Sequence, residues 1–203
     1  HSNLRFTCET LSNNLLNEII TIINQADKYL YLSTYSIVGL NTLEELSQSI
    51  QKAIERGVSI VIFCRGMNYR NDHLEGVLKL SKIGCLVYAD LFNHSKGVIN
   101  EISGMIFTAN IDGNHGLRNG FEVGYILNEI QRLEFLDLHK KLIETSFYVF
   151  DNKPTRNDLF DTYLAYEMQK GLKAPLLPQN AFVTYKETLN VNLEELKSSI
   201  IFY

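Results

Sequence analysis

The side chains best suited to chemistry lie in three short segments: His94-Ser95-Lys96, Thr108-Ala109-Asn110 and Asn119-Gly120-Phe121-Glu122. We expect a β-strand to begin at His94. Because alternate residues of a strand share a face, it would present the His94 imidazole beside the Lys96 ammonium. An imidazole can attack phosphorus, a lysine and an asparagine can hold the non-bridging oxygens, and a carboxylate can fix the imidazole tautomer. His94, Lys96, Asn110 and Glu122 therefore predict attack on a phosphodiester.

The apolar pattern indicates the elements that would position these segments. Helical spacing predicts helices over 11–26, 42–56, 72–83 and 131–143, and β-rich runs predict strands over 29–37, 58–63, 85–89, 94–99, 104–108 and 121–127. Thr42 and Glu45 form a capping-box pattern, and Gly57 and Gly84 mark the ends of two helices. This order predicts an α/β fold with a mixed β-sheet flanked by helices. We assign the chemistry to a domain at 4–150, followed by a mostly helical C-terminal extension at 151–203 of unassigned role.

The charge of the chain limits the kinds of partner it can bind. The 203 residues carry a formal net charge of −4, which argues against a protein that coats long stretches of nucleic acid. A few local cations can still form a small anion site. Arg65 and Arg70 follow a predicted strand, and His115 and Arg118 precede Glu122, so we expect these four to surround a phosphate. For Arg70 and Arg118, a solvated position in a loop is an equal alternative.

Neither a metal nor a cofactor is indicated. The histidines and cysteines show no ligand spacing, and no glycine-rich phosphate loop is present. The three cysteines form no CxxC pair, and Cys64 and Cys85 fall in or beside predicted buried strands, which indicates a reducing, cytoplasmic compartment. No apolar run approaches the ~18 residues that a transmembrane helix needs. His73 and His139 are expected on exposed helix surfaces, the latter because two lysines follow it.

These segments resemble the phospholipase D superfamily, whose motif is H-x-K-x4-D followed by G-S-x-N. His94 and Lys96 match its first positions, Asn110 matches the asparagine, and Thr108 stands where the serine would be. The stretch 116–124, which holds Glu122, resembles the region in which a glutamate of the family supports the histidine. The resemblance covers residues 11–150.

Three departures from the family pattern affect the motif. The spacing from Lys96 to Asn110 is one residue short, and Phe107 replaces the glycine. The aspartate position falls on Glu101, with Asn100 just before it. Either Asn100 or Glu101 is therefore the residue that stands in for the aspartate.

The resemblance implies metal-independent hydrolysis through a phosphohistidine. The family mechanism uses two histidines, whereas this chain carries one complete motif, so a second copy in a homodimer or a missing half of a longer chain must supply the other. Dimeric single-motif members are often endonucleases, and we favour cleavage of DNA or RNA. The alternatives are a phospholipid hydrolase or phosphatidyl transferase, and an inactive phosphate-binding or dimerisation module of a larger protein.

Overall fold

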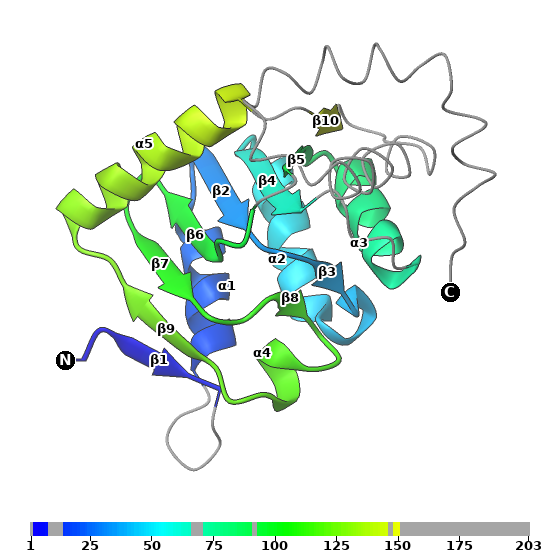
Figure 1. Cartoon of the computed structure of the whole chain (residues 1–203), viewed down its shortest axis with the longest axis horizontal. Helices are drawn as coiled ribbons and strands as arrows, with labels where there is room; N and C mark the ends of the chain where they lie inside the picture. The colour runs from blue at the N-terminus through cyan, green and yellow to red at the C-terminus, as the bar shows by residue number, and fades with distance from the viewer. Residues whose placement is uncertain (1, 8–13, 66–70, 91–92, 146–147, 151–203) are drawn as a thin grey trace, which may run out of the picture.

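One mixed sheet of eight strands forms the centre of the described chain (Figure 1). The computed structural model describes residues 2–7, 14–65, 71–90, 93–145 and 148–150. In spatial order the strands are β1 (Leu4–Phe6), β9 (Val123–Ile126), β7 (Gly104–Phe107), β6 (Gly97–Asn100), β2 (Tyr29–Ser33), β4 (Ser59–Arg65), β5 (Leu86–Asp90) and β10 (Tyr148–Phe150). Strands β2, β4 and β5 are parallel, and every other neighbouring pair is antiparallel.

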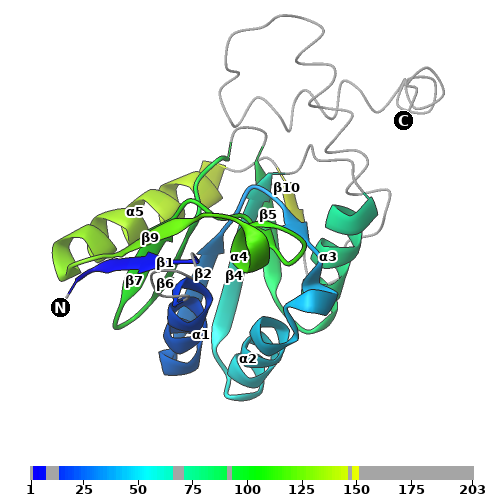
Figure 2. The same cartoon turned by 90° about the horizontal axis from the view of Figure 1, so that it is seen from below.

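Helices cover both faces of the sheet. Helices α1 (Leu15–Gln25) and α2 (Glu44–Glu55) lie on one face, and α5 (Glu129–Thr145) lies across the other (Figure 2). Adjacent residues of β6 show the two sides: Val98 belongs to the core that α1 and α2 bury, whereas a side chain at Gly97 would meet the ring of Phe135 in α5. The mixed sheet flanked by helices confirms the fold predicted from the sequence.

The core forms because α1 and α2 each present an apolar stripe to the sheet. Leu15, Ile19 and Ile23 recur every four residues along α1, and Leu46 and Ile50 do so on α2; all five side chains are fully buried. Such spacing places them on one face of each helix. Burying each side chain contributes about 1.5–3 kcal/mol to folding.

Smaller elements lie beside the main sheet. Strands β3 (Ile37–Val38) and β8 (Ile111–Asp112) form a separate parallel pair. The short helix η1 (Leu40–Thr42) follows β3, and α4 (Gly116–Asn119) follows β8. Helix α3 (Asn71–Lys82) packs against β3 and β5.

The predicted helix ends are right, but the predicted capping box is wrong. Gly57 and Gly84 take φ values of 88° and 113°, which a residue with a side chain rarely adopts, and each follows the end of a helix. Thr42 instead lies in η1, and its hydroxyl donates to the Gly39 and Gly113 carbonyls at 2.9 and 2.7 Å. The left-handed turn at Gly39 tightens the chain into η1, so α2 begins without a side-chain cap.

The prediction that His139 lies on an exposed helix face is also wrong. His139 is only 1% exposed and lies in the inner stripe of α5, together with Arg132, Phe135 and Leu136. Ile130, Leu133 and Leu138 of this helix are exposed although they are apolar. Two polar residues thus occupy buried positions that an apolar pattern cannot reveal.

Some predictions fall on residues outside the described ones. They concern Arg70, Cys8, the side chain of His73 and the extension at 151–203.

Cys64 and Cys85 are buried free thiols, as expected, and burial raises the pKa of each to about 12. In the described ranges, no helix combines the length and the apolar character needed to cross a membrane.

Candidate active site

The register of four adjacent strands brings the motif residues to one end of the sheet. Strands β2, β6, β7 and β9 are successive antiparallel neighbours. Beyond the end of the β6–β7 ladder, the Phe107 amide donates to the Lys96 carbonyl at 3.1 Å. Beyond the β7–β9 ladder, the Thr108 amide donates to the Val123 carbonyl at 2.9 Å. Lys96 is thus opposite Phe107, and Thr108 is opposite Val123, so Lys96, Thr108 and Glu122 lie within two residues of one another along the register at the same end of three neighbouring strands.

His94 and Lys96 lie just before β6 rather than within it, which corrects the predicted start of this strand. Their side chains still meet: Nζ of Lys96 is 3.1 Å from Nδ1 of His94 and also donates to the His94 carbonyl at 3.1 Å. An ammonium can only donate, so Nδ1 accepts and the ring proton lies on Nε2 in this arrangement. The His94 side chain is exposed, so substrate can reach it.

Asn93 fixes the loop that carries His94, a role that sequence patterns did not reveal. This residue is 6% exposed, and its Nδ2 donates to the Thr34 and Phe63 carbonyls at 3.0 and 3.2 Å, at the carboxyl ends of β2 and β4. Its Oδ1 accepts from the amide and the hydroxyl of Ser95, at 3.2 and 2.7 Å. One buried amide thus connects the loop that carries His94 to two parallel strands.

Thr34 links the His94 loop to the segment that holds Asn110. Its carbonyl accepts from Asn93, and its hydroxyl accepts from the Ile111 amide at 3.0 Å. Asn110 directly precedes Ile111, and its side-chain oxygen is buried with no hydrogen-bond partner in the structure. A buried polar atom without a partner is costly, and it is typical of a group that awaits a ligand.

Glu122 lies beside Lys96 and is held by Thr108. The Thr108 hydroxyl donates to Oε2 of Glu122 at 2.5 Å and accepts from the Val123 amide at 3.0 Å. The Thr7 hydroxyl fixes the same turn by accepting from the Glu122 amide at 2.8 Å. The carboxylate that the resemblance assigns to His94 is therefore held by a hydroxyl at the family's serine position.

Burial and charge act in opposite directions on Lys96. Desolvation lowers the pKa of its ammonium, and the Glu122 carboxylate raises that pKa again, with a net effect below the ordinary lysine value. The interaction shows that the two charges are close enough to influence one another. A partly desolvated cation is well suited to bind a phosphate oxygen, because water competes with it less.

The side chains predicted to bind phosphate lie in different places relative to His94. Arg65 lies over the Tyr35 ring, 5.0 Å from its centre, and the same ring is 5.4 Å from the His94 imidazole, so Arg65 belongs to the cluster. Arg118 instead binds the Thr42 carbonyl and Glu45 at the start of α2. His115 is exposed at the start of α4.

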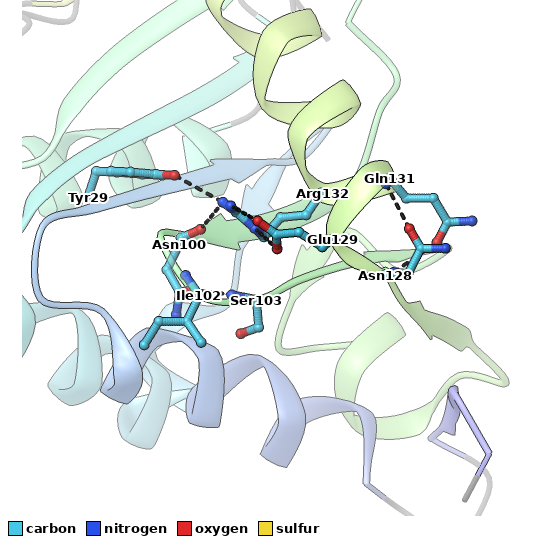
Figure 3. Close-up of polar contacts among 8 residues, drawn as sticks. All are labelled: Tyr29, Asn100, Ile102, Ser103, Asn128, Glu129, Gln131 and Arg132. Atoms are coloured by element: carbon cyan, nitrogen blue, oxygen red, sulfur yellow. Dashed lines mark hydrogen bonds and ion pairs between the residues drawn. The ribbon is translucent and has the colours of Figure 1, made fainter.

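Asn100 and Glu101 lie at the opposite end of β6 from His94. Figure 3 shows Asn100 at this end, in contact with Arg132 of α5. Oδ1 of Asn100 accepts from the Ile102 and Ser103 amides at 2.7 and 2.6 Å, and its Nδ2 donates to the Ile22 carbonyl. Both residues at the motif's aspartate position therefore stabilise the fold rather than contact the His94 cluster.

Two further contacts complete this end of the sheet. Arg132 of α5 donates to the Asn100 carbonyl at 2.9 Å and pairs with Glu129. Glu101 accepts from the amides of Asp27, Lys28 and Tyr29. Desolvation opposes ionisation of Glu101, but these donors outweigh it and lower the pKa of its carboxyl.

The described side chains include no group of three or more His, Cys, Asp or Glu residues arranged to hold a metal ion. At the His94 end of the sheet, the groups available for chemistry are an exposed imidazole, two cations, an amide and a carboxylate. Together these groups can hold a phosphate and attack it.

No family model and no curated protein matches the sequence. Among solved structures, the chain is similar to a phospholipase D family member, Nuc from Salmonella typhimurium, at a TM-score of 0.59 and 15% identity over 73% of this chain and 96% of that one. NucT from Helicobacter pylori matches with a TM-score of 0.53 and 16% identity, over 70% of this chain and 95% of that one. Phosphatidylserine synthase from Haemophilus influenzae Rd KW20 matches with a TM-score of 0.54 and 15% identity, over 96% of this chain and 46% of that one. The chain therefore has a phospholipase D-like fold.

Proposed function

We propose that this chain hydrolyses phosphodiester bonds of nucleic acid without a metal, through a phosphohistidine formed on His94. The observation that carries the proposal is the convergence of His94, Lys96 and the Thr108–Glu122 pair at one end of the sheet. Arg65 adds a second cation to this cluster. The phospholipase D-like fold supports the same chemistry.

The attack requires a change in the contact between Lys96 and His94. A bound phosphate draws the ammonium towards its non-bridging oxygens, which frees Nδ1 to carry the ring proton, with Glu122 as its acceptor. Nε2 then forms a bond to phosphorus, and the bond to the leaving oxygen breaks. Lys96 and the side-chain amide of Asn110 stabilise the charge that gathers on the oxygens. A second histidine protonates the leaving oxygen and later activates the water that breaks the Nε2–phosphorus bond.

We propose that a second copy of this chain supplies the second histidine. The chain matches 96% of Nuc but 46% of the phosphatidylserine synthase, so it corresponds to about half of the longer protein. Phe121, next to Glu122, is 71% exposed, and in this proposal the partner copy covers it. Chains of His94→Ala mixed with wild type should lower activity more than dilution does; a loss in proportion to dilution would contradict the dimer.

Nucleic acid is the proposed substrate, and the cytoplasm is the proposed compartment. In this proposal Arg65, which lies over the Tyr35 ring, contacts a backbone phosphate next to the one under attack. The unpaired, buried thiols of Cys64 and Cys85 fit a reducing environment. The net charge of −4 favours local recognition of a few phosphates over binding along the duplex.

The test is a substrate panel in EDTA. Single- and double-stranded DNA, RNA, phospholipid vesicles and bis-p-nitrophenyl phosphate are each incubated with wild type and with His94→Asn. We expect wild type to cleave nucleic acid and the nitrophenyl ester in the presence of chelator, and the variant to be inactive. Cleavage of phospholipid alone would contradict the proposal that nucleic acid is the substrate. Activity that requires Mg²⁺ would contradict the proposed metal-independent mechanism. Inactivity on every substrate would indicate the binding or dimerisation module.

A further inference from the structure

A cavity of about 470 Å³ lies between α3 and the turns that follow β3 and β8. Glu75 and Lys79 of α3 line one side, and Asn41 and Asn114 line the other, with Leu40 between them. Its size is within the range of pockets that bind small ligands. The lining combines two amides, a carboxylate and an ammonium, so it offers both donors and acceptors.

Two glycines shape the walls of this cavity. A side chain at Gly76 would lie 2.6 Å from Ile37, so α3 can approach β3 only without one. A side chain at Gly39 would lie 2.8 Å from the amide oxygen of Asn114, so that amide lies directly over the turn. Gly39 also has a φ of 63°. A side chain at either position would therefore displace a wall of the cavity.

The cavity and the His94 cluster lie at opposite ends of the β3–β8 pair. Tyr35 and Asn110 precede these strands at the end near His94, and Gly39 and Asn114 follow them at the cavity end. Gly39 is four positions after Tyr35, which corresponds to at most about 13 Å of extended chain. A group in the cavity is thus within a few nucleotides of a phosphate at His94.

We propose that this cavity binds a nucleobase of the substrate, an inference that rests on the proposed nuclease function. Asparagine amides can pair with the donor and acceptor edge of a base, and a carboxylate accepts from an exocyclic amine. Leu40 supplies an apolar surface against the ring, and Lys79 can bind a ring acceptor or the adjoining phosphate. Because a base must leave the stack of a duplex to enter a cavity, the cavity takes an unpaired base and favours single-stranded substrate.

The first experiment compares substrates with and without a base. The kcat/KM ratio of a single-stranded hexanucleotide to bis-p-nitrophenyl phosphate is measured for wild type, Asn114→Ala and Lys79→Ala. Lys82→Ala is the matched control, since it removes the same charge from the exposed last turn of α3. We expect the ratio to fall about tenfold in the two cavity variants and to stay unchanged in the control. An unchanged ratio in both cavity variants, with unfolding temperatures near wild type, overturns the proposal.

The second experiment separates this inference from the proposed function. Adenosine monophosphate and ribose 5-phosphate, which differ only by the base, are titrated into the His94→Asn chain and into the same chain carrying Asn114→Ala. We expect the base to tighten binding about tenfold, and Asn114→Ala to remove that advantage. Equal affinities overturn the base site even if nucleic acid is cleaved. A base advantage that depends on Asn114 supports the site even if wild type cleaves no nucleic acid.

Discussion

Nζ of Lys96 lies 3.1 Å from Nδ1 of His94 and occupies the ring nitrogen that must carry a proton when Nε2 attacks. The cation proposed to bind phosphate and the imidazole proposed to attack it are therefore in contact in the free protein. In the proposed mechanism, substrate binding and formation of the reactive tautomer are one event, because the phosphate oxygens compete with Nδ1 for the same ammonium.

Replacing Lys96 tests this relationship. Lys96→Met should lower kcat on bis-p-nitrophenyl phosphate about 100-fold or more, since the developing charge loses a donor. Lys52→Met, on the exposed side of α2, is the control and should keep the wild-type rate. A Lys96→Met rate within threefold of wild type would show that this ammonium has no part in the reaction.

The charge of Glu122 should determine where activity falls off at high pH. Burial lowers the pKa of Lys96 and Glu122 raises it, so Glu122→Gln removes the opposing effect and lowers the pKa further. Because the cation must be protonated to bind phosphate, activity is lost as pH rises through that pKa. The alkaline limb of the kcat/KM profile should therefore move to lower pH in Glu122→Gln; a limb that stays in place or moves to higher pH contradicts the assignment.

Thr108 should be replaceable by serine but not by valine. Its hydroxyl donates to Glu122 and accepts from the Val123 amide, and serine keeps both contacts. Thr108→Val has the same shape without the hydroxyl and should lower kcat about tenfold, while KM changes little. If Thr108→Ser loses as much kcat as Thr108→Val, the hydroxyl is not what holds the carboxylate.

His139 should make the protein less stable in acid. Burial lowers the pKa of its imidazole, which contacts the Ser33 hydroxyl through Nε2 and the Phe135 carbonyl through Nδ1 at 2.9 Å. A folded-state pKa below the unfolded value of about 6.5 means that the unfolded chain binds a proton first, so stability falls as pH drops below that value.

Urea unfolding between pH 5 and 8 measures this effect. His139→Gln should flatten the acid slope of the unfolding free energy, whereas His115→Gln, at an exposed position, should keep it. Ser33→Ala should cost about 1–3 kcal/mol at pH 8, because it leaves a buried ring nitrogen without its partner. An identical pH slope in His139→Gln and wild type would place the titrating group elsewhere.

The convergence of the motif followed from local patterns. Lys96, Thr108 and Glu122 each adjoin a strand. A short turn joins β6 to β7, and β9 is the antiparallel neighbour of β7 although β8 and α4 lie between them in the sequence. The sequence therefore predicted that these three residues lie near one another, whereas it also placed Arg118 and the Asn100–Glu101 pair in the site, and these bind elsewhere. It misplaced the start of β6, because His94 and Lys96 fit an alternating pattern that the loop held by Asn93 does not follow.

The buried polar side chains that hold the site and the helix beside it could not be predicted from local sequence patterns. Asn93 bonds to Thr34, 59 residues earlier in the sequence, through one buried side-chain amide. Arg132 and His139 are buried in α5, while Ile130 and Leu133 on the same helix are exposed. Each buried polar group is stabilised by partners from distant strands, and hydrophobic periodicity carries no information about such partners.

The most direct test of the account is to detect phosphorus on His94. Wild type is mixed with bis-p-nitrophenyl phosphate in EDTA, quenched in base at short times, and the peptide that contains His94 is examined by mass spectrometry. We predict a nitrophenyl-phosphoryl adduct on His94, formed together with a burst of nitrophenolate and absent from His94→Asn. Turnover that leaves His94 unmodified at every quench time, or that persists in His94→Asn, would contradict the account.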